Sequence, residues 1–349
     1  MQDGTQEFPP PPGRIGQLMR VVIILLSVIT LGALVAHFSD LRRAADVLLS
    51  GNLRLVGLAL LAQVAAYVAY SAAYQCSFET VGIQARLGWV ANTYVQSLLS
   101  AIIIPAGTIA LFLAALRERG QPTSRAALAL LFVRAADLLA YSALFSGLIL
   151  YLAIREHVDR PELFGIGVTL AVTGTLVALL VLMARRPEGL SRLLTRLSLG
   201  ITRLFLALNR PSPFPEEAAL NLSHQIEESA AAITQNRSNS AHLLLWTLSS
   251  HLLDVLTLHL LFLAFHHSVS FDIVLAGFVI GWLFFVIPIA PQGIGVVEGA
   301  MIVTYQGSGV PLETAVVVTA AFRALSFWLP AVLGAALLEW RTGRRLLSR

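Results

Sequence analysis

Long apolar stretches dominate this sequence and decide what it can fold into. Eight of them are long enough to enter or cross the roughly 30 Å hydrocarbon core of a bilayer. Hydrophobic residues make up 56% of the 349 residues and charged residues only 13%, a charged fraction about half that of a soluble domain. We therefore predict an integral membrane protein. The stretches lie at 21–39, 53–75, 88–116, 126–153, 164–184, 241–265, 272–307 and 312–338.

The pattern within the stretches indicates helices. None alternates with a period of two, as a barrel strand does, so the predicted fold class is an all-α polytopic membrane protein. The 24 basic residues are all arginines and lie in clusters between apolar blocks, which indicates membrane topology and excludes nucleic-acid binding as the reason for the high pI. A single cysteine, Cys76, excludes a disulfide framework or a thiolate metal site within one chain. We expect no metal and no cofactor.

Helix-breaking residues interrupt two of the stretches near their middle. Pro105 and Gly107 interrupt the third stretch, and Pro288 and Pro291 interrupt the seventh. Proline removes a backbone donor, and freed backbone groups persist at membrane depth only where protein or a wet cavity satisfies them. Each broken stretch is therefore either a kinked span or a re-entrant hairpin.

The positions of the arginines favour the re-entrant alternative. Short cytoplasmic loops retain arginine. Six full spans and two re-entrant hairpins, with the N-terminus inside, place 17 of the 24 arginines in the cytoplasm and five outside, with two inside spans. Eight straight crossings give a weaker bias of 13 to nine, with both termini outside. We predict that the first hairpin enters from the cytoplasm, that the second enters from outside, and that both termini are cytoplasmic.

The same assignment divides the chain into two membrane halves. The first half contains the broken segment 88–116 and the second half contains the broken segment 272–307. Between them, an amphipathic pattern with arginines on its polar side predicts linker helices at the membrane surface. The predicted order is a disordered cytoplasmic tail at 1–20, a first membrane half at 21–184, a cytoplasmic linker at 185–240, a second membrane half at 241–338 and a basic cytoplasmic tail at 339–349.

A short internal repeat follows the two breaks. The segment from Gly120 to Arg134 and the segment from Gly309 to Arg323 both read G-x-P-x3-A-x7-R. In the predicted topology the helix with Arg134 runs outward and the helix with Arg323 runs inward. This is an inverted repeat, an arrangement that in many transporters places the substrate site at the midplane between interrupted helices.

Arg134 and Arg323 are the main candidate site residues, because an arginine this deep in a span must face a cavity or a partner. Arg134 has Asp137 three residues further on, so an internal salt bridge is one interpretation and a functional role is the other. Arg323 has no acidic neighbour on its own helix, and Glu298 is its predicted partner. We expect Arg323 to bind an anionic head group; the alternative is structural bracing.

The segment from Pro291 to Glu298 is a candidate anion site. Gln292, Gly293 and Gly295 precede the point where a helix restarts, and the N–H groups of a helix N-terminus favour phosphate. A carboxylate in the first turn also suits the helix dipole. Glu298 is therefore either part of a head-group site or a cap for its own helix.

A polar stripe marks the sixth apolar stretch. Thr247, Ser250, His251 and Asp254 lie on one face of the predicted helix. Such a stripe most often forms hydrogen bonds between helices. In the functional interpretation, His251 and Asp254 form a proton-titrating pair that couples transport to protons. No zinc-ligand spacing accompanies them.

The C-terminal part of the chain resembles a known family. The residues Pro288, Pro291-Gln-Gly293-Ile-Gly295-Val-Val-Glu298, Gly309-Val-Pro311, Arg323 and Leu329-Pro330 are similar to the signature of the lysylphosphatidylglycerol synthase transmembrane family, also called the flippase-like domain family. The first half fits more loosely through Pro105-Ala106-Gly107 and Arg134-x2-Asp137. It departs from the family pattern at Ile109 to Leu113, which are wholly apolar where the family often has an acidic residue and an arginine.

The resemblance implies a protein of the cell membrane, of a kind that in some members moves an aminoacylated or other anionic lipid between leaflets. Only the short basic tail at 339–349 follows the last predicted span, so we expect no soluble aminoacyltransferase domain and no aminoacyl-transfer activity.

Three functions fit these patterns to different degrees. The first is a lipid translocase for an anionic phospholipid or a polyprenyl-phosphate-type lipid, with membrane lipids as its partners. The second is a non-transporting partner or scaffold of an envelope-lipid biosynthesis enzyme. The third is a stand-alone membrane enzyme, which is disfavoured because no nucleophile, base and orienting residue occur together. We predict that the protein is not an enzyme.

Overall fold

The computed structural model describes residues 51–103, 107–155, 174, 236–286, 293–334 and 336–337. Within these residues the regular structure is entirely helical, and four helices are long and apolar enough to cross a membrane. The predicted helical membrane architecture is thus confirmed at this level. The predicted stretches at 21–39 and 164–184, both tails and nearly all of the linker lie outside the described residues. The four long helices are Leu53–Thr80, Thr123–Leu152, Ser238–Ala264 and Leu312–Gly334.

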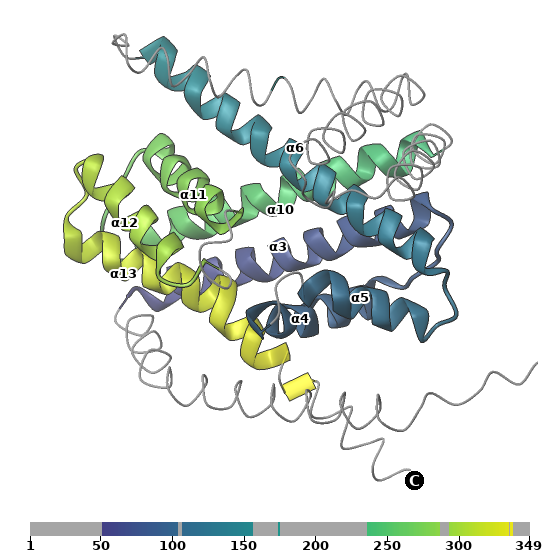
Figure 1. The fold of residues 1–349 in the computed structure, drawn as a ribbon. Coiled ribbons are helices and arrows are strands. Elements are labelled where there is room, and N and C mark those ends of the chain that lie inside the picture. Colours follow the sequence, from purple (N-terminus) through teal and green to yellow (C-terminus); the bar gives the residue numbers. More distant parts are fainter. Residues whose placement is uncertain are drawn as a thin grey trace, which may run out of the picture.

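Two long antiparallel helices run side by side through the centre of the molecule (Figure 1). They are α3 (Leu53–Thr80) and α10 (Arg237–Ala264). Each begins where the other ends: the Asn52 N–H donates to the Ala264 carbonyl at 2.9 Å, and the Asn236 side-chain amide donates to the Thr80 carbonyl at 3.0 Å. These bonds satisfy backbone carbonyls that a helix end leaves without a partner.

Small side chains allow this central pair to approach closely. Buried alanines recur along α3 every three or four residues, which places them on one face. Small residues let helix backbones come together in membrane proteins, where packing rather than the hydrophobic effect drives association. The buried alanines with this spacing are Ala59, Ala62, Ala66, Ala69 and Ala73, and Ala72 is buried beside them.

The first broken stretch folds as an antiparallel helical hairpin, which we call hairpin 1. It consists of α4 (Leu87–Ile103) and α5 (Gly107–Arg117). Near its open end the Arg119 guanidinium lies 4.0 Å from the centre of the Trp89 ring. Near its tip, Gly107 lies so close to Ser100 that a Cβ at residue 107 would overlap the Ser100 carbonyl oxygen. Glycine is therefore required for the two helices to meet there.

The second broken stretch also folds as an antiparallel hairpin, hairpin 2. It consists of α11 (Phe271–Val286) and α12 (Val296–Gly307). Gly281 faces the Met301 side chain and Gly277 faces the Tyr305 ring. At 1.5 Å per residue these helices are about 24 and 18 Å long, shorter than the roughly 30 Å hydrocarbon core.

The long helix that follows each hairpin packs on the other hairpin. In α6 (Thr123–Arg155), the Tyr141 hydroxyl donates to the Val279 carbonyl of α11 at 2.7 Å, and its ring stacks on Trp282 at 3.9 Å. The corresponding helix of the second half begins as α13 (Leu312–Arg323) and continues through a π-helical turn, η2 (Ala324–Trp328), to Gly334. There Gly334 lies against the Val95 carbonyl of α4.

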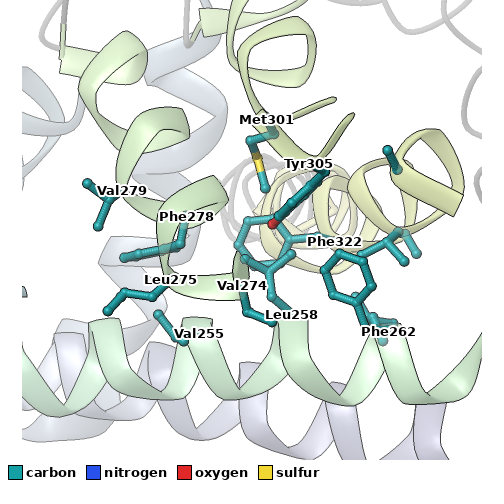
Figure 2. Close-up of a cluster of buried hydrophobic side chains, with 14 of the residues drawn as sticks. Val255, Leu258, Phe262, Val274, Leu275, Phe278, Val279, Met301, Tyr305 and Phe322 are labelled. Carbon is teal, nitrogen blue, oxygen red and sulfur yellow. The ribbon is translucent and has the colours of Figure 1, made fainter. Parts of the chain in front are cut away.

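Each hairpin is anchored by an apolar cluster. Figure 2 shows the cluster around hairpin 2, where Phe262 of α10 meets Tyr305 of α12 edge-on with ring centres 5.0 Å apart. Around hairpin 1, Tyr74 of α3 stacks on Phe112 of α5 at 4.6 Å. Both hairpins are therefore held to the central helix pair by aromatic contacts, which are worth about 0.5–1.5 kcal/mol each beyond area burial.

The turns of the two halves carry the same backbone hydrogen bonds. After α3 the Ile83 N–H donates to the Phe78 carbonyl, and after α10 the His267 N–H donates to the Phe262 carbonyl. The turns that follow the hairpins match in the same way. After α5 the Gln121 N–H donates to Leu116, and after α12 the Val310 N–H donates to Tyr305. The two halves therefore share the geometry of their turns as well as the order of their helices.

The close approach at Gly107 yields a stability prediction. We expect Gly107→Ala to lower the free energy of unfolding by about 1–3 kcal/mol, because the added methyl meets backbone that cannot move independently. Gly88→Ala is the matched control: it lies in α4, and nothing is within 4 Å of the position that a Cβ would take there. SDS-induced unfolding in mixed micelles measures both. Equal stability of the two variants would contradict the observed hairpin packing.

Candidate functional site

A polar cavity is lined by helices from both predicted membrane halves. Its volume is about 210 Å³, which is many times the roughly 10–15 Å³ that a single water needs by this measure. Residues of α3 to α6, α10 to α13 and η2 line it. The cavity brings together five of the predicted site residues from three helices: Arg134, Asp137, His251, Asp254 and Arg323.

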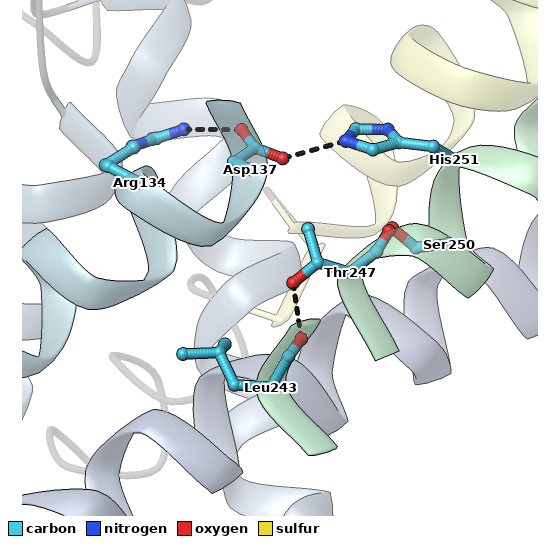
Figure 3. Close-up of polar contacts among 6 residues, drawn as sticks. All are labelled: Arg134, Asp137, Leu243, Thr247, Ser250 and His251. Atoms are coloured by element: carbon cyan, nitrogen blue, oxygen red, sulfur yellow. Dashed lines mark hydrogen bonds and ion pairs between the residues drawn. The ribbon is translucent and has the colours of Figure 1, made fainter. Parts of the chain in front are cut away.

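Arg134, Asp137 and His251 form a chain of polar contacts in the cavity lining (Figure 3). An Arg134 nitrogen lies 3.6 Å from Asp137 Oδ2, and His251 Nε2 lies 3.0 Å from Asp137 Oδ1. The Arg134 side chain is 39% exposed, whereas those of Asp137 and His251 are 8% and 6% exposed. The internal salt bridge predicted from the i, i+3 spacing is therefore present. It leaves the guanidinium partly accessible.

Arg323, which lines the cavity, forms a tighter pair with Glu298, which lies outside the cavity lining. Arg323 Nε donates to Glu298 Oε1 at 2.5 Å, as the sequence predicted, and the Arg323 side chain is only 8% exposed. The guanidinium also lies 4.4 Å from the centre of the Phe327 ring. Because Arg323 belongs to α13 and Glu298 to α12, this pair fastens hairpin 2 to the following span.

Glu298 also caps its own helix. Its Oε2 accepts from the Gly295 N–H at 2.7 Å, so this N–H is already bonded to a carboxylate of the chain. Gly293 and Gly295 have φ angles of 65° and 81°, a region that glycine enters without strain. Glu298 therefore has two contacts within the chain: it neutralises Arg323 and it starts α12.

Several predicted residues of the breaks lie outside the described residues. These are Pro105, Pro288, Pro291 and Gln292. Gly107 serves the packing of hairpin 1, and the next residue, Thr108, lines the cavity.

The polar stripe of α10 divides into two kinds of contact. Thr247 and Ser250 donate to carbonyls of their own helix, a common arrangement for hydroxyls in membrane helices. His251 and Asp254 reach other helices: His251 meets Asp137 of α6, and Asp254 accepts from the Gln63 amide of α3 at 2.9 Å. The two residues predicted as one titrating pair therefore have different hydrogen-bond partners.

Sequence reasoning missed the aromatic wall of the cavity. Tyr67, Tyr70 and Tyr74 of α3 and Tyr94 of α4 all line it. The signal was present, because the three tyrosines of α3 recur at i, i+3 and i+7 on one helical face. The Tyr67 hydroxyl donates to the Ser326 carbonyl at 2.5 Å. Ser326 lies in the π-helical turn η2, a feature often found at functional sites.

A known protein family matches most of the chain. A family described as "Lysylphosphatidylglycerol synthase TM region" matches residues 17–334. The chain belongs to this family. The matched range includes both hairpins and every cavity-lining residue. Residues 17–334 are therefore those of an integral membrane region, in agreement with the four long apolar helices.

Similar curated proteins carry names that describe location rather than activity. Two are UPF0104 membrane proteins of Methanothermobacter thermautotrophicus. One is 30% identical over 198 residues, which is 54% of this chain and 55% of the relative. The other is 32% identical over 89 residues, which is 26% of each chain. A UPF0104 membrane protein of Methanocaldococcus jannaschii is 36% identical over 84 residues, or 24% of this chain and 25% of the relative. The alignments thus span about a quarter to about half the length of these family relatives.

The Arg323–Glu298 pair yields a second prediction. We expect Glu298→Gln to lower the free energy of unfolding by about 3 kcal/mol, because it leaves a buried guanidinium without its carboxylate. Glu313→Gln is the matched control, since Glu313 is an exposed acid in the first turn of α13. Thermal unfolding of the two purified variants in detergent measures the difference in their stability. Equal melting temperatures for the two variants would show that the pair does not hold hairpin 2.

Proposed function

We propose that this protein is a lipid translocase that moves an anionic phospholipid or a polyprenyl-phosphate-type lipid between membrane leaflets. The observation that carries the proposal is the central cavity, which is lined by arginines from both halves of the chain. Charged residues inside membrane segments are costly and mark substrate pathways. Membership of a family named for a lipid synthase's membrane region is consistent with a lipid substrate.

The head-group site would lie between the two arginines. Arg134 is the accessible cation, and its 3.6 Å contact with Asp137 is long enough for a phosphate oxygen to compete for the guanidinium. Arg323 lines the cavity from the second half, with its charge shared with Glu298. We also propose Gly293, Gly295 and Glu298, which lie outside the cavity lining, and the preceding Gln292 as parts of this head-group site. The lipid tails stay in the bilayer, since the cavity admits a head group only.

The proposed topology is six full spans and two re-entrant hairpins in an inverted repeat. Three observations support it: the described hairpin helices have only 11 to 17 residues, α3 and α10 run in opposite directions, and the turns of the two halves carry the same hydrogen bonds. Both termini are proposed to lie in the cytoplasm, and the protein in the cell membrane.

The two hairpins differ in how they are fastened, which indicates where movement occurs. Hairpin 2 is tied to α13 through Glu298 and Arg323. When the matching turns at Gln121 and Val310 are aligned, Ile109 of hairpin 1 takes the place of Glu298, and an isoleucine cannot form an ion pair with Arg134. We therefore propose that hairpin 1 is the element that moves during alternating access, and that hairpin 2 stays fixed.

Proton coupling is proposed for the titratable residues of α10. His251 faces Asp137 from α6, the rings of Phe278 and Trp282 from α11, and Asp254 one turn further along α10. Protonation of His251 would strengthen its bond to Asp137 and loosen Asp137 from Arg134. Arg134 would then be available to a head group, which links proton binding to lipid binding.

No enzymatic activity is proposed. The cavity contains acids, arginines and a histidine, but the described residues include no nucleophile held by a base and an orienting group. A non-transporting partner of an envelope-lipid biosynthesis enzyme remains the alternative, and the transport assay decides between the two.

The transport proposal predicts that Arg134 controls leaflet exchange. We expect Arg134→Gln to slow the exchange of a fluorescent anionic phospholipid in proteoliposomes by roughly tenfold, about the worth of one charge-assisted hydrogen bond. Arg134→Lys should retain part of the activity. Arg117→Gln is the matched control, because Arg117 is an exposed arginine at the end of α5 that does not line the cavity.

The same assay is repeated with a panel of anionic and polyprenyl-phosphate lipids, with and without a proton gradient. If lipid exchange is never faster than in protein-free vesicles, translocation is excluded and the partner alternative is favoured.

The inverted topology predicts that two matched loops lie on opposite sides of the membrane. Gln84 follows α3 and Ser268 follows α10 at equivalent positions, and both are exposed. In a Cys76→Ser background, a membrane-impermeant thiol reagent should label Ser268→Cys in intact cells and Gln84→Cys only after permeabilisation. Labelling of both from the same side would contradict the inverted repeat.

A further inference from the structure

We infer that Asp254 and Gln63 form a binding site for a monovalent metal cation, Na⁺ in particular, within the central cavity. Asp254 comes from α10 and Gln63 from α3, so the site lies where the two halves of the molecule meet. The inference deepens the proposed function by naming a second coupling ion, and its transport consequence rests on that function. The binding site itself stands on the geometry alone.

Within the described residues, none of the cations of the cavity forms a salt bridge with Asp254. Arg134 is paired with Asp137, and Arg323 is paired with Glu298. His251 directs its Nε2 to Asp137. The Asp254 carboxylate accepts a hydrogen bond from the Gln63 amide at 2.9 Å. An ionised carboxylate at membrane depth is costly unless a cation or a proton neutralises it.

Gln63 supplies a second oxygen that is available to a cation. The residue is 2% exposed and lines the cavity, and its Nε2 donates to Asp254. Its Oε1 is buried and has no donor among the described residues. Buried acceptors are almost always satisfied, so an exception of this kind calls for an unseen partner. A cation beside the carboxylate would satisfy both oxygens.

The surrounding groups fit a hard monovalent ion. Carboxylate, amide and hydroxyl oxygens are the ligands that hard cations select. Tyr67 lies one helical turn from Gln63 and lines the same cavity. Its hydroxyl donates its proton to the Ser326 carbonyl, which leaves its oxygen lone pairs free to accept. One carboxylate carries one negative charge, and therefore neutralises one Na⁺ without a surplus.

A proton on Asp254 is the competing explanation. Protonation would neutralise the carboxyl, and its O–H would then be a donor for Gln63 Oε1, so sodium binding and the pH dependence of stability separate the two. The two arginines of the cavity already have carboxylate partners, and neither forms a salt bridge with Asp254 within the described part of the chain. The charged or titratable groups that share the cavity with Asp254 are His251 on its own helix, Tyr67, Tyr70 and Tyr74 on α3, Tyr94 on α4, Arg134 and Asp137 on α6 and Arg323 on α13.

Binding of radioactive sodium to the purified full-length protein in detergent tests the inference. We expect saturable binding at neutral pH that choline does not compete for, and a higher melting temperature in sodium than in choline chloride, since a ligand that binds only the folded state stabilises it. Asp254→Asn keeps the acceptor for Gln63 but removes the charge, and should abolish both effects. Gln63→Leu should weaken binding by at least about tenfold.

Thr257→Val is the control, because the Thr257 hydroxyl lies one turn from Asp254, donates to the Leu253 carbonyl at 2.9 Å and to the Ala59 carbonyl at 3.5 Å, and lies outside the cavity lining. It should bind sodium like the unchanged protein. The inference is overturned if folded protein shows no saturable sodium binding, or if Asp254→Asn and Gln63→Leu both bind sodium normally. A melting temperature that depends on pH but not on sodium would assign a proton to Asp254 instead. None of these results depends on lipid exchange, so the site and the transport function can fail separately.

Discussion

The cost of placing arginine inside a membrane governs the rest of this structure. A guanidinium at membrane depth costs several kcal/mol unless it meets a carboxylate or water. Arg134 and Arg323 each meet a carboxylate, and both face one cavity. To build that cavity the chain has to interrupt two helices and fold them back as hairpins, because only then do side chains from all the described helices and the π-helical turn converge at one point.

The sequence alone was enough to predict the helical membrane class and several contacts. Hydropathy located the long helices, and the i, i+3 spacing of Arg134 and Asp137 predicted their salt bridge. The pairing of Arg323 with Glu298 followed from the absence of an acid near Arg323 on its own helix. These predictions succeeded because a charged side chain in hydrocarbon has to meet an opposite charge or a polar cavity, and the sequence offers few such partners.

Contacts between distant helices could not be predicted in the same way. The sequence predicted that Asp254 of α10 forms a titrating pair with His251. In the structure, its carboxylate accepts a hydrogen bond from Gln63 of α3. From the sequence alone, the tyrosines of α3 could not be distinguished from ordinary packed residues. The structure places them on the face of α3 that lines the cavity. Periodicity specifies which residues share a face of one helix, but not what that face meets. The antiparallel pairing of α3 with α10 decides this, and it depends on small residues such as Ala59 and Ala66 along the interface.

Transport through this cavity requires it to open in turn to each side of the membrane. Ser250 lines the cavity and is 3% exposed, so a cysteine at this position reports access to the cavity itself. The decisive measurement, in a Cys76→Ser background, is the reaction of Ser250→Cys with a membrane-impermeant thiol reagent added to one face of the bilayer at a time. Alternating access predicts reaction from both faces, slowed by an anionic lipid. Reaction from one face only, or from neither, would contradict it.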